Sequence, residues 1–300
     1  MIAIADNAAF AAGPRRTASV APRRRRHAAV LPGFGTSAAI TSLVVLSLVV
    51  FPLAVLILRA ASLGPAGFFD AAWTPRSRAA YAVSLSASVI AAVVSSLLGL
   101  LVAWVLARIE FPGRRLLDAL VDVPLALPTA VAGLVYSALY VKKGWLGQWL
   151  VPLGIKGAYS FLGIVLVLVF VSLPFAIRVV QPVIESLDRD VEEAARILGA
   201  SRSQTFLRVV LPAILPAVVT GFAMALARAL GEYGSVVFIS GNMPFKTEIA
   251  PVLIVARLEE FAYAEATAIA VVLLAMSLTL LVVINVLQHR LSRNAVGAEK

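Results

Sequence analysis

Residues 193–212 read EAARILGASRSQTFLRVVLP, a charged segment that lies between two long apolar stretches. Just upstream, Asp190 and Glu193 have the spacing of a capping box. We therefore expect a short helix that starts near Val191 and ends before Gly199. The glycine supplies a residue that adopts the left-handed conformation without strain, which is a common way to stop a helix.

A second short helix is expected directly after this glycine. Ser201 followed by Gln204 repeats the capping spacing, and Pro212 limits the helix where the next apolar stretch begins. The whole connection, residues 181–208, is long and unusually charged for this chain. Glu193 beside two alanines gives the first helix a small apolar patch with a charged rim, which suits docking into a groove of another protein.

The composition of the chain indicates a membrane protein. Of its 300 residues, 61% are hydrophobic and only 14% are charged, whereas soluble domains average about 45–50% and about 25%. So little charge does not provide enough polar surface for a soluble particle of this size. We therefore expect the lipid bilayer to surround much of a single membrane domain.

Six apolar stretches are long enough to cross about 30 Å of hydrocarbon as helices. They lie at about 38–58, 83–107, 118–141, 158–180, 210–236 and 264–288. The predicted fold is all-α: a polytopic membrane protein with six transmembrane helices and a cytosolic helix between the fourth and the fifth. An even number of crossings places both termini on one side.

The basic residues predict the orientation. If the N-terminus is cytosolic, 17 of the 26 Lys and Arg residues lie inside, 8 lie outside and Arg228 lies within a span. This bias favours cytosolic termini. Six of the inside residues are arginines in the segment 1–37, where a positive anchor beside the first span, or a contact with anionic lipid, is expected. Because the basic residues adjoin apolar stretches, we expect no nucleic-acid partner.

The predicted organisation has three parts. A basic cytosolic segment covers residues 1–37, a transmembrane domain covers 38–292 with its cytosolic loop at 181–208, and a cytosolic tail covers 293–300.

Catalytic and metal-binding functions find no support in the sequence. The chain has no cysteine, which rules out disulfides and thiolate metal sites. Its two histidines, His27 and His289, flank the first and last spans and cannot form a zinc pair on one helix. We predict no catalytic residue, no metal and no cofactor. Without a G-x4-G-K-[ST] loop the chain is expected to bind no nucleotide itself.

Small residues recur at every fourth position in the second and third spans. They are Ser84, Ser88, Ala92 and Ser96 in one and Thr129, Gly133 and Ser137 in the other. Such ladders let helix backbones approach each other closely. Packing within the chain is the favoured interpretation, and lining of a pore is the alternative.

The fifth span ends with ionisable residues, which are costly in a membrane and therefore need a reason. Arg228 and Glu232 stand four apart on one helical face and can neutralise each other. Alternatively they border a substrate path, with Arg228 attracting an anion, Tyr233 beside them and the pair Gly231 and Gly234 allowing a bend at a gate. The sequence leaves both interpretations open.

The charged loop resembles a known family. The positions E-A-A-x3-G-x9-I-x-L-P are typical of permease subunits of ATP-binding-cassette (ABC) importers, and this chain departs from the motif only by a valine in place of the isoleucine. The matching residues are Glu193, Ala194, Ala195, Gly199, Val209, Leu211 and Pro212. The resemblance implies the type I importer permease fold, in which this loop sits like a ball in a socket of a separate ATPase. ATP hydrolysis by that partner would then drive a change between inward-facing and outward-facing states.

Residues 35–292 also resemble the T-type permease subunit of sulfate/thiosulfate importers. The resemblance rests on ALPTAVAG at 126–133, on GEYG at 231–234 with its continuation to Ile249, and on ARLEEF at 256–261. It implies a bacterial inner-membrane complex containing this chain, a second permease subunit, two copies of an ATPase and an external sulfate-binding protein. A molybdate or tungstate permease is the alternative, because the Gly-Glu-aromatic-Gly turn is shared. An ion-coupled secondary transporter is the second and less favoured alternative function.

Overall fold

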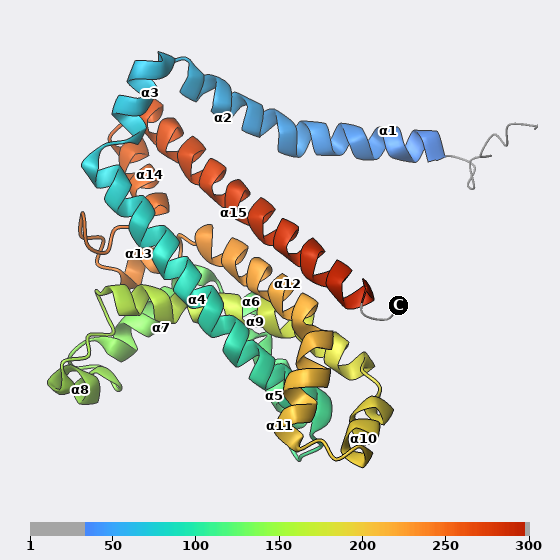
Figure 1. Cartoon of the computed structure of the whole chain (residues 1–300). Helices are drawn as coiled ribbons and strands as arrows, with labels where there is room; N and C mark the ends of the chain where they lie inside the picture. The colour runs from blue at the N-terminus through green and yellow to red at the C-terminus, as the bar shows by residue number, and fades with distance from the viewer. Residues whose placement is uncertain (1–33, 298–300) are drawn as a thin grey trace, which may run out of the picture. The chain divides into compact units, whose positions relative to one another are not determined.

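The computed structural model describes residues 34–297, and all the regular structure in this range is helical. The chain divides into two compact units, Met1–Pro52 and Leu53–Lys300. The α-helices of Figure 1 are α1 (Phe34–Val45), α2 (Phe51–Ala61), α3 (Gly64–Ala72), α4 (Pro75–Arg108), α5 (Arg114–Val121), α6 (Val123–Ala126), α7 (Thr129–Tyr140), α8 (Gly147–Leu150), α9 (Phe161–Ser186), α10 (Arg189–Ile197), α11 (Arg202–Thr205), α12 (Leu211–Leu230), α13 (Val236–Ile239), α14 (Ala250–Glu259) and α15 (Tyr263–Gly297). Two π-helical turns (Leu46–Val50 and Phe206–Val210) and one 3-10 turn (Val151–Leu153) complete them.

Five helices in the described range are long and apolar enough to cross a membrane, or six if one bent pair counts as a single span. The five are Gly35–Ala61, Pro75–Arg108, Phe161–Ser186, Arg202–Leu230 and Tyr263–Gln288. Their mean hydropathies lie between 2.2 and 2.8, which suits hydrocarbon. The expected all-α architecture is therefore confirmed, with ends that differ from the sequence-based limits by a few residues at most positions.

The third predicted span is wrong as a single continuous helix. Helices α5 and α6 lead into α7 through a break at Leu127 and Pro128, and the two halves are bent by 107°. Leu127 is extended (φ −80°, ψ 130°), as expected for a residue that precedes proline. Because Pro128 lacks an amide donor and disfavours the helical conformation before it, a pattern of apolar residues alone does not reveal this break.

The fifth predicted span is also shifted. The helix runs from Arg202 to Leu230, whereas the apolar pattern placed it at 210–236. Pro212 does not limit the preceding short helix as expected, because the π-helical turn Phe206–Val210 joins α11 to α12 without a break. In this turn the Leu211 amide bonds to Phe206 O. A π turn before a proline moves the backbone carbonyls away from the proline ring, which normally clashes with the residue four positions earlier.

The core of the second unit lies where α4, α9 and α12 pack together. Ala176 of α9 sits between two glycines: a Cβ on Gly99 of α4 would lie 2.8 Å from its Cβ, and one on Gly221 of α12 would lie 3.2 Å from its backbone oxygen. Small residues thus allow three helix backbones to approach closely, as is common in membranes. Ser95 and Ser172 add a buried hydrogen bond of 2.9 Å between α4 and α9.

The serine ladder of α4 serves packing in this chain. Ser84, Ser88, Ala92 and Ser96 are all buried. Ser84 Oγ accepts a 2.7 Å hydrogen bond from the amide of Ala250, the first residue of α14. This supports the favoured interpretation of the ladder, because its members face neighbouring helices of the same chain.

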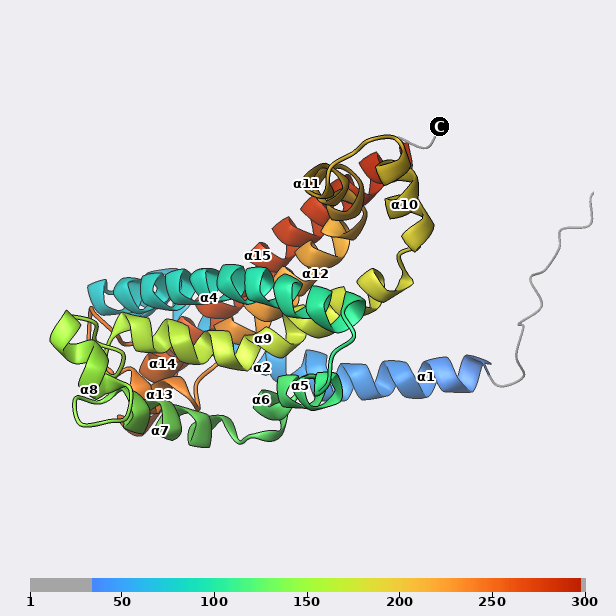
Figure 2. The same ribbon diagram turned by 90° about the horizontal axis from the view of Figure 1, so that it is seen from below.

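The three-helix bundle has two different ends, visible in Figures 1 and 2. Helices α10 and α11 lie at the end where α4 finishes, and α13 and α14 lie at the opposite end, near the start of α4. The two regions singled out in the sequence therefore occupy different places: the charged loop lies at one end, and the turn after α12 lies toward the other.

The first unit, described from residue 34, carries an apolar helix whose residues 35–50 are all exposed. An exposed apolar helix is stable in lipid or against a partner, because its backbone is satisfied internally. The predicted basic segment 1–37 lies outside the described residues except for its last four, and the tail 293–300 is described only as far as Gly297 within α15.

Candidate functional site

The first short helix of the charged loop forms where expected, with a different cap. Helix α10 begins at Arg189, and the Asp188 carboxylate accepts a 3.0 Å hydrogen bond from the Asp190 amide. The expectation that Asp190 is the cap and that the helix starts near Val191 is thus wrong by two residues. Aspartate caps a helix because its carboxylate satisfies a free amide of the first turn, and Asp188 is placed to do so.

The stop and the second cap are as predicted. Gly199 has a φ of +86°, and its amide bonds to Arg196 O at 2.9 Å while the Ala200 amide bonds to Ala195 O. Ser201 then forms a complete capping box with Gln204, in which each side chain bonds the other residue's amide. The motif therefore folds as helix, left-handed turn, helix, and a residue with a Cβ would be strained at position 199.

The motif residues on α10 and its turn face away from the chain. Glu193, Ala194 and Gly199 are exposed, and Ala195 is half-buried. Beside them the large apolar side chains of Ile197 and Leu198 are 86% and 88% exposed. These two adjacent large side chains, on a charged element at the end of the bundle, form an apolar patch that the described chain leaves uncovered.

The later motif residues have another role. Leu211 packs against the buried cluster that includes Val210 and Ile214, whereas Pro212 is exposed at the start of α12. The first motif residues, Glu193 to Gly199, therefore lie on an exposed surface. Leu211, at the other end of the motif, packs into the bundle directly after the π-helical turn.

The second candidate site forms a compact polar turn after α12. The Glu232 side chain is 3% exposed and accepts three hydrogen bonds: from Arg228 Nη1, from the Ser235 amide at 2.9 Å and from Ser235 Oγ at 2.9 Å. The structure thus brings Arg228 and Glu232 together as an ion pair, as the first interpretation required. Ser235 was not predicted as a partner, although a hydroxyl three residues after a buried acid is a typical one.

The two glycines of this turn differ in how closely they pack. Gly231 caps α12 with φ −87°, and a Cβ there would contact only Ala227 O at 3.9 Å. At Gly234 a Cβ would lie 2.4 Å from Thr129 Oγ1 of α7. Gly234 is therefore required for close packing, Gly231 is required for neither packing nor conformation, and Tyr233 between them is partly exposed.

Sequence reasoning missed an ionic link near the charged loop. Arg178 of α9 donates to both Asp118 and Asp122 of the broken third span at 2.6 Å, and also to Asp118 O. The signal was visible as three charges inside two predicted apolar stretches, since such charges are normally paired. The pairs hold the first half of the broken span against α9.

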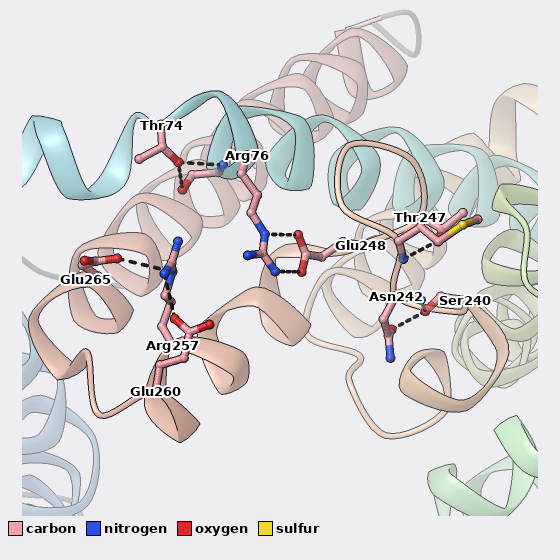
Figure 3. A network of polar contacts seen from close by, with 11 residues as sticks. Thr74, Arg76, Ser240, Asn242, Thr247, Glu248, Arg257, Glu260 and Glu265 are labelled. Atoms are coloured by element: carbon pink, nitrogen blue, oxygen red, sulfur yellow. Dashed lines mark hydrogen bonds and ion pairs between the residues drawn. The ribbon is translucent and has the colours of Figure 1, made fainter.

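A second missed network lies at the opposite end and is shown in Figure 3. Arg76 at the start of α4 forms two parallel hydrogen bonds of 2.8 and 2.6 Å with Glu248, whose side chain is 3% exposed. Arg257 of α14 pairs with Glu260 and also with Glu265 of α15. A bidentate arginine–carboxylate pair is a strong and directional contact, so Arg76 and Glu248 clamp the loop before α14 to the bundle, while Arg257 ties the end of α14 to α15.

Comparison with known proteins identifies the family. Residues 95–296 match the family described as binding-protein-dependent transport system inner membrane component. The matched range includes the whole charged loop and the polar turn.

Curated relatives match most of the chain. It is 47% identical over 268 residues to the sulfate transport system permease protein CysT of Escherichia coli (strain K12), which covers 89% of this chain and 97% of that protein. It is 50% identical over 250 residues to a probable sulfate transport system permease protein of Nephroselmis olivacea, covering 83% and 88% respectively.

Solved structures agree on the fold. A bacterial ABC transporter that imports the acidic polysaccharide alginate superposes with a TM-score of 0.70 at 19% identity, over 86% of this chain and 96% of that one. At this identity the likeness concerns the fold alone. Together with the match of residues 95–296 and the relatives near half identity, it shows that this chain belongs to the binding-protein-dependent inner-membrane transport components, the permease subunits of ABC importers.

Proposed function

We propose that the chain is the membrane-spanning subunit of an ATP-driven importer for sulfate and thiosulfate. The observation that carries the proposal is the 47% identity over 97% of a protein named as a sulfate permease. The same relatives favour sulfate over molybdate or tungstate as the main solute. The family favours an ATP-driven system over an ion-coupled secondary transporter.

The exposed surface of α10 is the proposed docking site for a separate ATPase. Glu193, Ala194 and Ala195 provide a small patch with a charged rim, and Ile197 and Leu198 add apolar area. A rigid helix that inserts into a groove is a recurring mode of protein recognition. The docked helix would pass its motion through the Gly199 turn to α11, and Leu211 and Pro212 would carry it into α12, because the π-helical turn connects α11 to α12 without a break.

The complete transporter, in this proposal, contains this chain, a second permease subunit, two copies of the ATPase and an external sulfate-binding protein. One of the structurally similar transporters was solved in complex with a pentasaccharide-bound periplasmic protein, which supports a binding protein for this fold. The proposed orientation places α10 and both termini on the cytosolic side of a bacterial inner membrane, because 17 of the 26 basic residues then lie inside. Residues 38–292 form the proposed transmembrane domain.

Arg228 is the proposed contact for the anion on its path. Within the described chain its guanidinium bonds only through Nη1, and the side chain remains 29% exposed. Glu232, held by Ser235, orients it. The remaining N–H groups match the oxygens of an oxyanion, which arginine binds with a planar fork. Gly231, Tyr233 and Gly234 shape the turn that forms the proposed gate beside it.

Transport into proteoliposomes tests the proposed function. The chain is purified with its partner subunits, and radioactive sulfate uptake is measured with ATP inside or outside the vesicles and with each loaded binding protein. We expect uptake only with ATP on the α10 side and a sulfate-loaded or thiosulfate-loaded binding protein. Uptake driven by an ion gradient without ATP would overturn the proposal, and stimulation by molybdate alone would reassign the solute.

The role of Arg228 is tested separately with Arg228→Ala. We expect sulfate uptake to fall by about tenfold or more while the amount of assembled complex changes little, because an anion contact acts on transport rather than on folding. Arg59→Ala, in an exposed position at the end of the first span, serves as the control for loss of a positive charge. Equal losses of uptake and assembly in Arg228→Ala would show that the residue serves packing.

A further inference from the structure

Arg108, the last residue of α4, links three elements: α4 itself, the end of α9 and α10. Its Nη2 donates a 3.0 Å hydrogen bond to Leu187 O at the end of α9 and pairs with Glu192 of α10 at 2.9 Å. Its guanidinium also lies 5.8 Å from the centre of the Trp104 ring, within the range of a cation–π contact. Neither Arg108 nor Glu192 belongs to the importer motif, which begins at Glu193.

Trp104 extends the contact to a fourth element. Its ring meets Phe206 of the π-helical turn edge to face, with ring centres 5.5 Å apart. The pair Trp104 and Arg108 therefore touches the end of α9, α10 and the start of the fifth span at once. Two adjoining cavities of about 250 and 180 Å³ border this group of side chains, between α4, α10 and the start of the fifth span.

Helix α10 has few other attachments to the bundle. Of its residues Arg189–Ile197, Glu192 and Ala195 are partly covered and all others are exposed. The Arg108 and Glu192 side chains are only 11% and 15% exposed, whereas those of the nearby pair Arg114 and Glu185 are 38% and 44% exposed and lie 3.9 Å apart. The Coulomb attraction within an ion pair shielded from water is stronger than within an exposed pair, and removing one partner leaves a shielded charge unpaired.

We propose that Arg108 and Glu192 form a positioning pair that makes α4 and the coupling helix α10 move as one body. This inference rests on the proposed docking of an ATPase on α10. When the ATPase displaces α10, the pair passes the displacement to α4, and Trp104 passes it to the start of the fifth span. Neither residue touches the solute or the nucleotide, so the pair acts only through the position of these helices.

Charge exchange tests the pair. Arg108→Glu and Glu192→Arg are each expected to retain association with the ATPase and basal ATP hydrolysis. In each single variant, two rates should fall by about tenfold: ATP hydrolysis stimulated by the loaded binding protein, and sulfate uptake. The double exchange Arg108→Glu/Glu192→Arg should restore part of both, because it rebuilds the ion pair in reverse but not the hydrogen bond to Leu187 O or the contact with Trp104. Arg114→Glu, at the exposed pair, is the matched control and should change little.

Three outcomes would overturn the inference: single variants with normal stimulated hydrolysis, a double exchange that restores nothing, or single variants that no longer bind the ATPase. The last would make Glu192 part of the docking surface. If wild type itself binds no ATPase, the proposed function fails, and this result is distinct from all three.

A crosslink provides a second measurement in case the charge variants do not fold. The chain has no cysteine, so Arg108→Cys/Glu192→Cys introduces the only two thiols, which a short bismaleimide can join. Because the two cysteines replace the ion pair, the uncrosslinked variant should show the reduced stimulated hydrolysis of the single variants. If α4 and α10 move together, the crosslink should raise this stimulated hydrolysis toward that of the wild type. Loss of stimulation on crosslinking would show that α10 moves relative to α4.

Discussion

The two ends of the bundle differ in how firmly they are held within the chain. At the end proposed for coupling (the coupling end), residues 187–205, α10 is exposed at most positions, and one shielded ion pair joins it to α4. At the clamped end, residues 240–265, the bidentate Arg76–Glu248 pair holds the loop before α14, Ser84 bonds the first amide of α14, and Arg257 ties α14 to Glu265 of α15. The chain therefore holds the clamped end by contacts of its own, whereas most of the coupling end is left uncovered by the described chain.

The tightest packing toward the clamped end is expected to show the largest loss of stability. A Cβ on Gly133 of α7 would lie 2.1 Å from Ser235 O, so Gly133→Ala must separate α7 from the polar turn. We expect a loss of about 3 kcal/mol, since overpacking against rigid backbone cannot be relieved by a rotamer change. The measurement is the melting temperature of the purified protein in detergent.

Gly67→Ala is the matched control for this change, because its Cβ would meet Leu63 Cβ at an ordinary 3.5 Å. Equal melting temperatures of the two variants would contradict the close approach of α7 and the turn.

The clamp itself gives the second effect. Glu248→Gln removes the charge that pairs with Arg76 and should cost about 2 kcal/mol, less than a fully buried pair because the Arg76 side chain is 30% exposed. Thermal unfolding of the purified protein checks this. Glu265→Gln, at a 43% exposed side chain that also pairs with an arginine, should cost under about 1 kcal/mol, and a similar cost for both would remove the distinction between them.

The coupling end should respond differently, in binding rather than in folding. Gly199→Val places a branched residue at φ +86°, a strain of about 1–2 kcal/mol that is relieved by opening the turn. We expect normal membrane levels but no co-purification with the ATPase. Gly199→Asn is the control, because asparagine tolerates this conformation. Normal association of the valine variant would count against docking at α10.

The smallest effect on stability is expected at the exposed apolar pair. Ile197→Ser and Leu198→Ser should change the free energy of unfolding by no more than about 0.5 kcal/mol, because these side chains contact little of their own chain. Association with the ATPase, measured by pull-down at several ATPase concentrations, should nevertheless weaken. Leu153→Ser, equally exposed at 74% but far from α10 in the sequence, should leave association unchanged.

Local features of the site were predictable because they depend on neighbours in the sequence. The left-handed turn at Gly199 and the capping box of Ser201 and Gln204 form within a few residues. The limits of α10 were predicted less well. Asp188 and Asp190 are both of the residue type that caps helices, and the box spacing with Glu193 favoured Asp190, whereas Asp188 is the cap in the structure.

Features that join distant segments were not predictable. The break at Leu127 follows from a proline whose effect depends on whether neighbouring helices support a bend. The fit of Ala176 between Gly99 and Gly221, the clamp of Arg76 on Glu248 and the pair of Arg108 with Glu192 all require segments far apart in the chain to meet.

The sequence by itself determined that this is a membrane protein, where its apolar helices lie and which loop carries the importer motif. Hydropathy depends on the residues of one span and capping on the residues of one turn, so both can be predicted from the order of residues alone. Only the tertiary structure decided that Arg76 pairs with Glu248 and that Arg108 pairs with Glu192, since each pair joins segments far apart in the chain. Burial sets the strength of such polar contacts, and burial exists only after the helices have packed.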